Sequence, residues 1–234
     1  MSRAGRPSEP VERTPAVRGA EGSSVLPAAG TQVPAALGFR VKSGWAAAVL
    51  LSGPAGAPAV AERSQVALSD PSVPHSRQPY HATTGVAQSD SAVLARLIEI
   101  VHRCARRSVA QLLDRHRAAG YRLLGAGIVV GSDAPPESIA NPHIRAHACE
   151  GRLFRAALEG GLQEYGVTCT VVVERALYAT ALPVLNGSEA SVRQAVTALG
   201  RGRFAGWRVD DKAAAVAAWL VLASHAPGPV VRIG

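Results

Sequence analysis

Polar and apolar residues alternate from Phe39 into Trp45, and the chain then stays apolar or small-residue as far as Leu51. Alternation is typical of a half-buried strand, and a continuous apolar run is typical of a strand buried on both faces. A second alternating segment runs from Val60 to Leu68, after a turn rich in Gly and Pro at 52–58. We therefore predict that a folded domain begins near Leu37 with a β-hairpin.

Further elements follow from apolar residues spaced three and four apart, which indicate helices, and from short apolar runs between loops, which indicate buried strands. Ser89 or Asp90 is a suitable N-cap for the first helix, and Asn141 followed by a proline is a suitable start for the second. The last helix is nearly all alanine, which allows it to lie close to a sheet. The predicted helices cover 89–119, 141–165, 176–185, 188–199 and 210–224, and the predicted strands cover 123–131 and 167–174.

Both ends of the chain are predicted to lie outside the domain. Residues 1–36 are rich in Pro, Gly, Ser and Ala with interspersed charges and have no helical or strand period, which is typical of a disordered tail. The domain then covers 37–226, and 227–234 form a short C-terminal tail. Residues 70–87 are predicted to form a loop, because this stretch contains three prolines and has no apolar period.

Composition narrows the class of protein. The chain is 47% apolar, but its most apolar stretches, around 45–51 and 213–223, are much shorter than the roughly 20 residues that cross a bilayer. We therefore expect no membrane span. Its three cysteines lack CxxC spacing, so we expect buried thiols rather than a disulfide framework or a zinc site. No apolar segment follows Met1, and the expected location is the cytoplasm.

The positive charge is carried almost entirely by arginine. The formal net charge is +8, and 23 of the 25 basic residues are Arg, since Lys occurs only at 42 and 212. Arginine suits phosphate recognition, which favours DNA or RNA as partner, although a coding bias toward Arg, Ala and Gly gives the same composition. Many of the arginines lie on the outer face of the long helix, which is either a phosphate-binding surface or a solvated face. The candidate nucleic-acid contacts are Arg77, Arg103, Arg107 and Arg203.

The order of elements indicates an α/β domain with a mixed sheet. Three segments are similar to RuvC-type Holliday-junction resolvases of the ribonuclease H-like superfamily. These are Cys169–Glu174 (CTVVVE), the helical stretch 176–199, and the alanine-rich helix that opens with Asp210 and Asp211. In resolvases a strand ending in Glu leads through a helical connection to a final helix that begins with aspartates. The resemblance implies a ribonuclease H-like mixed sheet over residues 38–225.

The same resemblance implies where a nuclease site would lie. Such nucleases hold two metal ions with carboxylates from the first strand, the end of the strand after the first helix, and the final helix. Here these positions fall at about Lys42, at 131–133 with Asp133 as the acid, and at Asp210 or Asp211. A lysine at the first position would repel Mg²⁺. We therefore predict a pseudo-nuclease site in which Lys42 pairs with one of these aspartates, which otherwise serve only as N-cap and first-turn acid.

The second helix brings further candidates. It follows a buried strand, so its start lies at the sheet edge where α/β proteins bind ligands. We expect Asp133, Asn141, His147 and Glu150 to share one cleft with Glu174 and Asp210. His143 and His147 have the i, i+4 spacing of metal ligands, but they lack the HExxH pattern and the sequence shows no third ligand. We therefore predict no metal site there. We expect instead a hydrogen bond between a histidine and a glutamate of this helix.

These observations favour one function and leave others open. The leading hypothesis is a catalytically degenerate ribonuclease H-like domain that binds DNA or RNA or acts structurally, without a cofactor. One alternative is an active nuclease, using Mg²⁺ or Mn²⁺ held by acids drawn from Asp133, Glu150, Glu174, Asp210 and Asp211. Another is a protein-interaction module that uses a sheet edge or the polar 70–81 loop, which contains His75, Arg77, Tyr80 and His81. Whether the protein is an enzyme, and its oligomeric state, stay open at this point.

Overall fold

The structure is a computed structural model that describes residues 32–83 and 86–225. Most of the two predicted tails therefore lies outside the described residues. The predicted boundary at residue 37 is too late, because the first strand already begins at Val33, and Ala35 and Ala36 are fully buried in it.

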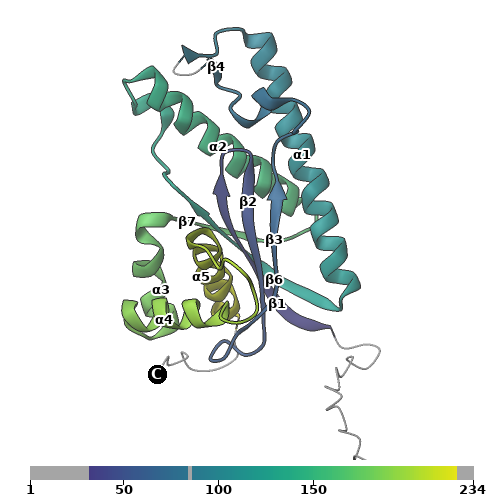
Figure 1. Cartoon of the computed structure of the whole chain (residues 1–234), viewed down its shortest axis with the longest axis vertical. Helices are drawn as coiled ribbons and strands as arrows, with labels where there is room; N and C mark the ends of the chain where they lie inside the picture. The colour runs from purple at the N-terminus through teal and green to yellow at the C-terminus, as the bar shows by residue number, and fades with distance from the viewer. Residues whose placement is uncertain (1–31, 84–85, 226–234) are drawn as a thin grey trace, which may run out of the picture.

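A five-stranded mixed sheet forms the centre of the molecule (Figure 1). Its order is β3-β2-β1-β6-β7, with β2 antiparallel to both of its neighbours, β1 and β3, and with β6 and β7 parallel to β1. This arrangement confirms the predicted α/β domain with a mixed sheet. The strands are β1 (Val33–Lys42), β2 (Trp45–Ser52), β3 (Ala59–Ala67), β6 (Tyr121–Val130) and β7 (Cys169–Val173).

The predicted first strand is in fact two strands. The chain turns back at Ser43 and Gly44, so that Lys42 pairs with Trp45 across the β1–β2 hairpin. Gly44 has φ +81°, a left-handed conformation that glycine adopts without steric cost. The apolar pattern hid this turn because both strands are buried and only two residues connect them. The N-terminal unit is therefore a three-stranded meander rather than a hairpin.

The helices agree closely with the prediction. Asp90 caps the first helix by accepting hydrogen bonds from the backbone N–H groups of Ala92 and Val93, and Asn141 caps the second in the same way. The helices are α1 (Ser91–Ala118), α2 (Pro142–Gln163), α3 (Leu177–Leu185), α4 (Glu189–Leu199) and α5 (Val209–Ser224). None of the helices in the described part of the chain is both long and apolar enough to span a bilayer.

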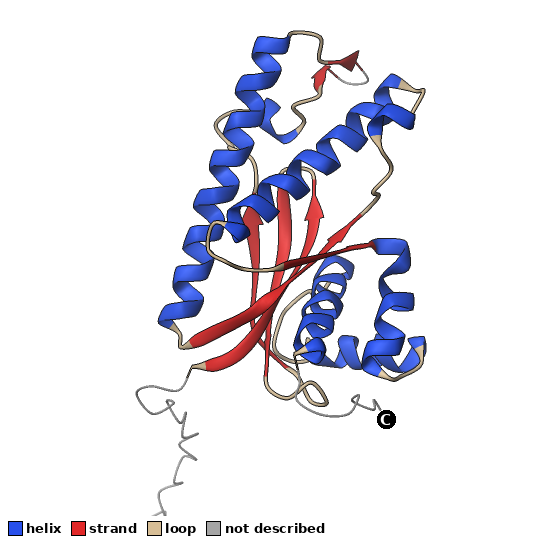
Figure 2. Ribbon diagram, turned by 180° about the vertical axis from the view of Figure 1, so that it is seen from behind, coloured by secondary structure: helices blue, strands red, loops and turns tan. Residues whose placement is uncertain are grey.

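The helices form two layers on the sheet (Figure 2). Helices α1 and α2 cover one face, and α3, α4 and α5 cover the other. Helix α5 lies against the sheet without intervening side chains, because a Cβ at Gly38 would stand 1.8 Å from the carbonyl oxygen of Ala214. Gly127 on β6 makes a similar close approach to Ala217. The small residues of β1, β6 and α5 thus fix this helix directly on the strands.

The crossover from β3 to α1 is more ordered than the predicted loop. It contains a 3₁₀ turn at Pro74–Arg77 and a two-stranded sheet of β4 (His81–Thr83) and β5 (Val86–Ala87). Ser76 anchors the turn, since its buried hydroxyl accepts a hydrogen bond from the backbone N–H of Asp70. This small sheet places His81 in the interior.

Candidate functional site

Three acidic side chains, one from the turn after β7 and two from α5, each meet a basic side chain from the sheet. Nη2 of Arg40 lies 2.5 Å from Oε2 of Glu174, and Nζ of Lys42 lies 3.5 Å from Oδ1 of Asp210. In the third pair, Nε of Arg63 donates to Oδ1 of Asp211 at 2.8 Å. The contact expected between Lys42 and an aspartate is therefore present. We call these six residues the acid–base centre.

Strand geometry explains why the bases face these acids. Side chains alternate along a strand, so Arg40 and Lys42 point to the same side of β1, toward α5. Phe39 and Val41 point to the other side and join the core under α1 and α2. The acids are supplied by the turn that follows β7 and by the first turn of α5.

Burial differs strongly within the acid–base centre. Asp211 is only 3% exposed, and its Oδ2 also accepts a 2.8 Å hydrogen bond from the backbone N–H of Arg208, which caps α5. Asp210 and Lys42 are partly exposed. Arg40 is 5% exposed, and its Nη1 donates to the carbonyl oxygen of Val41. Asp211 thus has both a capping role and an ion-pair role, which the sequence had offered as alternatives.

Arg40 and Arg63 are the residues that the sequence analysis missed in this centre. Lys42 is the last residue of β1, whereas Arg40 lies inside the strand on the same face. Gly131 directly follows β6 and is the first of the positions 131–133 among which the second acid was expected, and a Cβ there would lie 3.8 Å from Nη2 of Arg40. The guanidinium of Arg40 therefore lies beside the segment that follows β6.

The predicted single cleft is wrong, because its proposed members line two different hollows or neither of them. A cleft of about 390 Å³ lies between α2 and the ends of β1 and β6. We call it the basic cleft, since its charged lining residues are Arg40, Lys42, Asp133, Arg152 and Arg155. His147 also lines it, and Asp133 pairs with Arg155 at 2.5 Å. Asp210 and Asp211 instead line a separate hollow with Arg63 and Arg208, on the α5 side.

The remaining members of the predicted cleft have other positions. Asn141 caps α2, and its side chain accepts hydrogen bonds from the backbone N–H groups of His143 and Ile144. Glu150 is buried, with 1% exposure, and lines neither hollow. Its Oε1 lies 2.7 Å from Nδ1 of His81.

His81 brings three imidazoles together. Its Nε2 lies 3.2 Å from Nδ1 of His143, and the ring of His147 is centred 4.5 Å from its own ring. We call His81, His143 and His147 the histidine cluster. The sequence analysis found the two histidines of α2 but not the third, because His81 is 62 residues away from His143 in the chain. Its position in a polar loop was the only available signal.

The four candidate nucleic-acid arginines do not form one surface. Arg77, on the 3₁₀ turn, and Arg103 and Arg107, on α1, are all exposed near the crossover. Hydrogen bonds from Ser72 lower the pKa of Asp70 in this crossover, and the charges of Arg103 and Arg107 contribute to the same shift. Arg203 is exposed in the loop between α4 and α5, on the opposite face of the sheet.

The cysteines offer no reactive site. All three are free and partly buried, and burial raises the pKa of each thiol. The pKa of Cys169 rises to about 11, so at neutral pH this thiol is protonated. The prediction of buried thiols thus holds in part.

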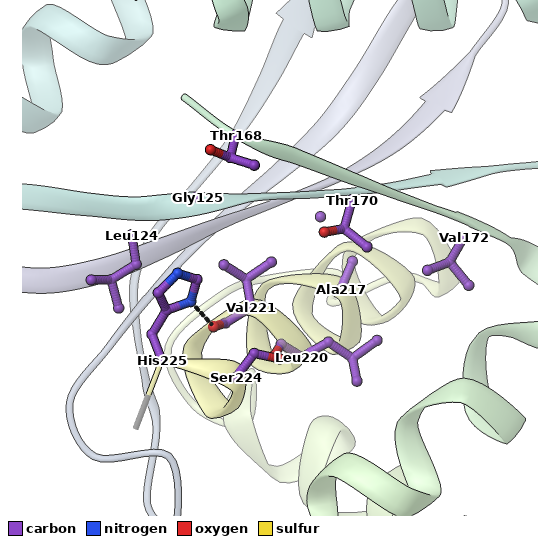
Figure 3. Close-up of a pocket in the computed structure, with 11 residues that line it drawn as sticks. Leu124, Gly125, Thr168, Thr170, Val172, Ala217, Leu220, Val221, Ser224 and His225 are labelled. Atoms are coloured by element: carbon purple, nitrogen blue, oxygen red, sulfur yellow. Dashed lines mark hydrogen bonds between the residues drawn. The ribbon is translucent and has the colours of Figure 1, made fainter. Parts of the chain in front are cut away.

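A smaller apolar hollow lies at the other end of α5 (Figure 3). It has a volume of about 140 Å³ and is lined by the starts of β6 and β7 and by the last turn of the helix. His225 turns back to the helix, with Nδ1 2.9 Å from the carbonyl oxygen of Val221. No carboxylate lines this hollow, and it is separate from the acid–base centre.

The fold of this chain is similar to the solved structures of two Holliday junction resolvases. No protein-family model matches the chain, and no curated protein sequence matches it significantly. RuvC of Thermus thermophilus, solved in complex with a Holliday junction substrate, aligns at 12% identity and a TM-score of 0.48, over 81% of this chain and 92% of that chain. The yeast mitochondrial Holliday junction resolvase aligns at 12% identity and a TM-score of 0.39, over 83% and 81% of the two chains. At this identity the similarity concerns the fold and carries over no residue role.

Proposed function

We propose that this protein is a ribonuclease H-like domain that binds the phosphate backbone of nucleic acid. We also propose that the domain has lost metal-dependent cleavage of that backbone. The observation that carries the proposal is the acid–base centre, where Glu174, Asp210 and Asp211 each have a basic partner.

Electrostatics argues against metal binding at this centre. Mg²⁺ is held by carboxylate oxygens and keeps several waters, so it needs anionic groups that face open space. Here a divalent ion would have to displace the guanidinium groups of Arg40 and Arg63 and the ammonium of Lys42. A unit charge pair at 4 Å is worth about 4 kcal/mol at an effective dielectric constant of 20, so each remaining base opposes the ion strongly.

The basic cleft supports an anionic partner. Four of its five charged lining residues are basic, although Arg40, Lys42 and Arg155 already pair with Glu174, Asp210 and Asp133. Arg152 is exposed, and its acidic partner, the exposed Glu137, is 3.8 Å away, so Arg152 is the lining base most open to a phosphate. Arginine forks match phosphate oxygens in two-point contacts. The chain has only 4% aromatic residues, so base stacking contributes little and binding is expected to follow the phosphate backbone.

The test is binding of branched DNA, single-stranded DNA and RNA to the full chain over a range of salt concentrations. We expect log K to fall linearly with log salt, because bound phosphates release counterions. Arg152→Ala, an exposed residue of the basic cleft, should reduce the slope by about 1. Arg193→Ala is the matched control, since Arg193 is an exposed arginine on α4, and it should leave the slope unchanged. Binding that does not depend on salt would contradict the proposal.

The same substrates test cleavage. Incubation with Mg²⁺ or Mn²⁺ should leave each of them intact. Cleavage that is lost in Asp210→Asn and Asp211→Asn variants would instead show an active nuclease, in which the metal displaces the bases of the acid–base centre.

A further inference from the structure

We propose that the histidine cluster binds one divalent transition-metal ion, with Zn²⁺ as the best match. The site is separate from the acid–base centre, and the proposal does not depend on nucleic-acid binding. Its ligands come from two elements, His81 from β4 and the pair His143 and His147 from the first turns of α2.

The spacing of the ring nitrogens fits a metal ion. One nitrogen from each of the three histidines lies within 4.8 Å of the other two. Zinc binds histidine nitrogen at about 2.0–2.1 Å in a tetrahedral arrangement, which places neighbouring ligand nitrogens about 3.3 Å apart. His81 Nε2 and His143 Nδ1 are already 3.2 Å apart. Small rotations of the exposed His143 and His147 rings would complete the set.

Glu150 prepares His81 as a ligand. Its carboxylate contacts Nδ1 of His81 at 2.7 Å, which places the proton on Nδ1 and leaves the lone pair of Nε2 facing the other two rings. A carboxylate behind a ligating histidine is the usual outer-shell arrangement of zinc sites, and it both orients the ring and raises its basicity.

The environment of Glu150 also calls for a cation. The residue is 1% exposed, and its Oε2 is buried without a hydrogen-bond partner. Nδ1 of His147 lies 3.4 Å from this oxygen. A buried carboxylate is costly unless its charge is offset, and a divalent ion on the histidine cluster supplies that charge next to it.

The ligand chemistry selects the class of metal. Imidazole nitrogen suits Zn²⁺ and its transition-metal neighbours, whereas Mg²⁺ and Ca²⁺ take oxygen ligands. Three protein ligands leave a fourth position for water or an anionic oxygen. Because His143 and His147 are exposed, this position faces solvent, and His147 also lines the basic cleft. The ion would join the small β4–β5 sheet to α2 at the rim of that cleft.

The experiment is titration of the chelator-treated full-length protein with Zn²⁺ by calorimetry, with metal content measured after dialysis. We expect one Zn²⁺ per chain and no heat from Mg²⁺. Co²⁺ in place of Zn²⁺ should give the intense visible absorption of a tetrahedral site. His143→Ala and His147→Ala should each lower Zn²⁺ affinity by at least tenfold, and since both side chains are exposed, neither change opens the core.

His75→Ala is the matched control, because His75 is an exposed histidine of the same crossover and lies outside the cluster. It should bind Zn²⁺ as the wild type does. Zinc binding that is unchanged in the His143 and His147 variants would overturn the proposal, and so would a wild-type protein that retains no zinc. The cluster would then be a hydrogen-bonded network only. Circular dichroism of each variant separates loss of a ligand from loss of the fold.

Discussion

Among the described residues, two buried histidines each contact a glutamate, and their surroundings differ. His81 contacts Glu150 at 2.7 Å, and His116 on α1 contacts Glu62 on β3 at 3.0 Å. Both oxygens of Glu62 are occupied, one by His116 and the other by Arg115 at 3.0 Å. Glu150 has one oxygen without a hydrogen-bond partner, and two further imidazoles face the free nitrogen of His81. Arg115 therefore completes the contacts of Glu62, although Nδ1 of His116 is buried without a hydrogen-bond partner. The His81 pair differs in that two more imidazoles stand beside it and can act as metal ligands.

This difference shows that a histidine–glutamate contact does not by itself define a site. Burial lowers the pKa of His116 although the charge and hydrogen bond of Glu62 oppose the shift. Burial would also raise the pKa of Glu62, but the hydrogen bond from Arg115 and the nearby His116 outweigh it and lower that pKa. The pair therefore stabilises the contact between β3 and α1. What distinguishes the histidine cluster is the set of groups that surround the pair.

The largest expected effect is stabilisation by zinc. At a free Zn²⁺ concentration 100 times the Kd, the free energy of unfolding should rise by about 2.7 kcal/mol, since only the folded state holds the ligands together. His143→Ala should lose this increment, whereas His116→Gln should keep it. Thermal unfolding with and without chelator measures it. An equal increment in the wild type and in His143→Ala would remove the distinction between the two pairs.

The second effect separates the two glutamates. Glu150→Gln should lower zinc affinity about 10–100-fold, because the outer-shell carboxylate that orients His81 loses its charge. Glu62→Gln has the same chemistry at the other pair and should leave zinc affinity unchanged. Competition with a chelator of known affinity gives both values. A Glu62→Gln variant with equally weakened binding would indicate a general loss of structure.

The third effect is a pH dependence that belongs to His116. Its pKa is lowered in the folded state, so below the ordinary value of 6.5 the unfolded chain binds more protons. The stabilisation is therefore complete above pH 6.5 and is lost as the pH falls toward the lowered pKa. One proton corresponds to at most about 1.4 kcal/mol per pH unit. Urea unfolding of metal-free protein between pH 7.5 and about pH 5 should show a shallower loss in His116→Gln than in the wild type.

The smallest effect concerns Arg115. Its side chain is about half exposed, so its ion pair with Glu62 is screened by solvent. Arg115→Ala should lower the free energy of unfolding by less than about 1 kcal/mol, with an unchanged slope against urea. A loss of several kcal/mol would show that the arginine is essential for holding the Glu62 pair.

Helices and their ends were predictable from the sequence because their signals are local. Asp90 and Asn141 cap the helices that they were expected to cap, and the alanine-rich helix lies against the sheet as predicted. The turn at Ser43 was not predictable in the same way. Two buried strands follow each other there with only two connecting residues, so the apolar pattern continues across the boundary.

Only part of each candidate site could be predicted, because most of its contacts join residues that are far apart in the sequence. The lysine–aspartate contact followed from a resemblance that placed β1 beside α5. Arg63 and Arg40 could not be assigned partners, since their contacts with Asp211 and Glu174 span 148 and 134 residues. The third histidine of the cluster, His81, was missed for the same reason, because its partners on α2 are far away in the chain. It becomes visible only when the crossover folds into a small sheet beside α2.

The close approach of α5 to the sheet has a consequence for the acid–base centre. The helix rests on Gly38 and Gly127, where its backbone touches the strands directly. A helix fixed at two such points has little freedom to slide or tilt, so the acids of its first turn and the bases of β1 form parts of one rigid body. Little conformational entropy is then lost when the charges pair. The separation between Lys42 on β1 and Asp210 on α5 is therefore set in large part by two residues that have no side chain.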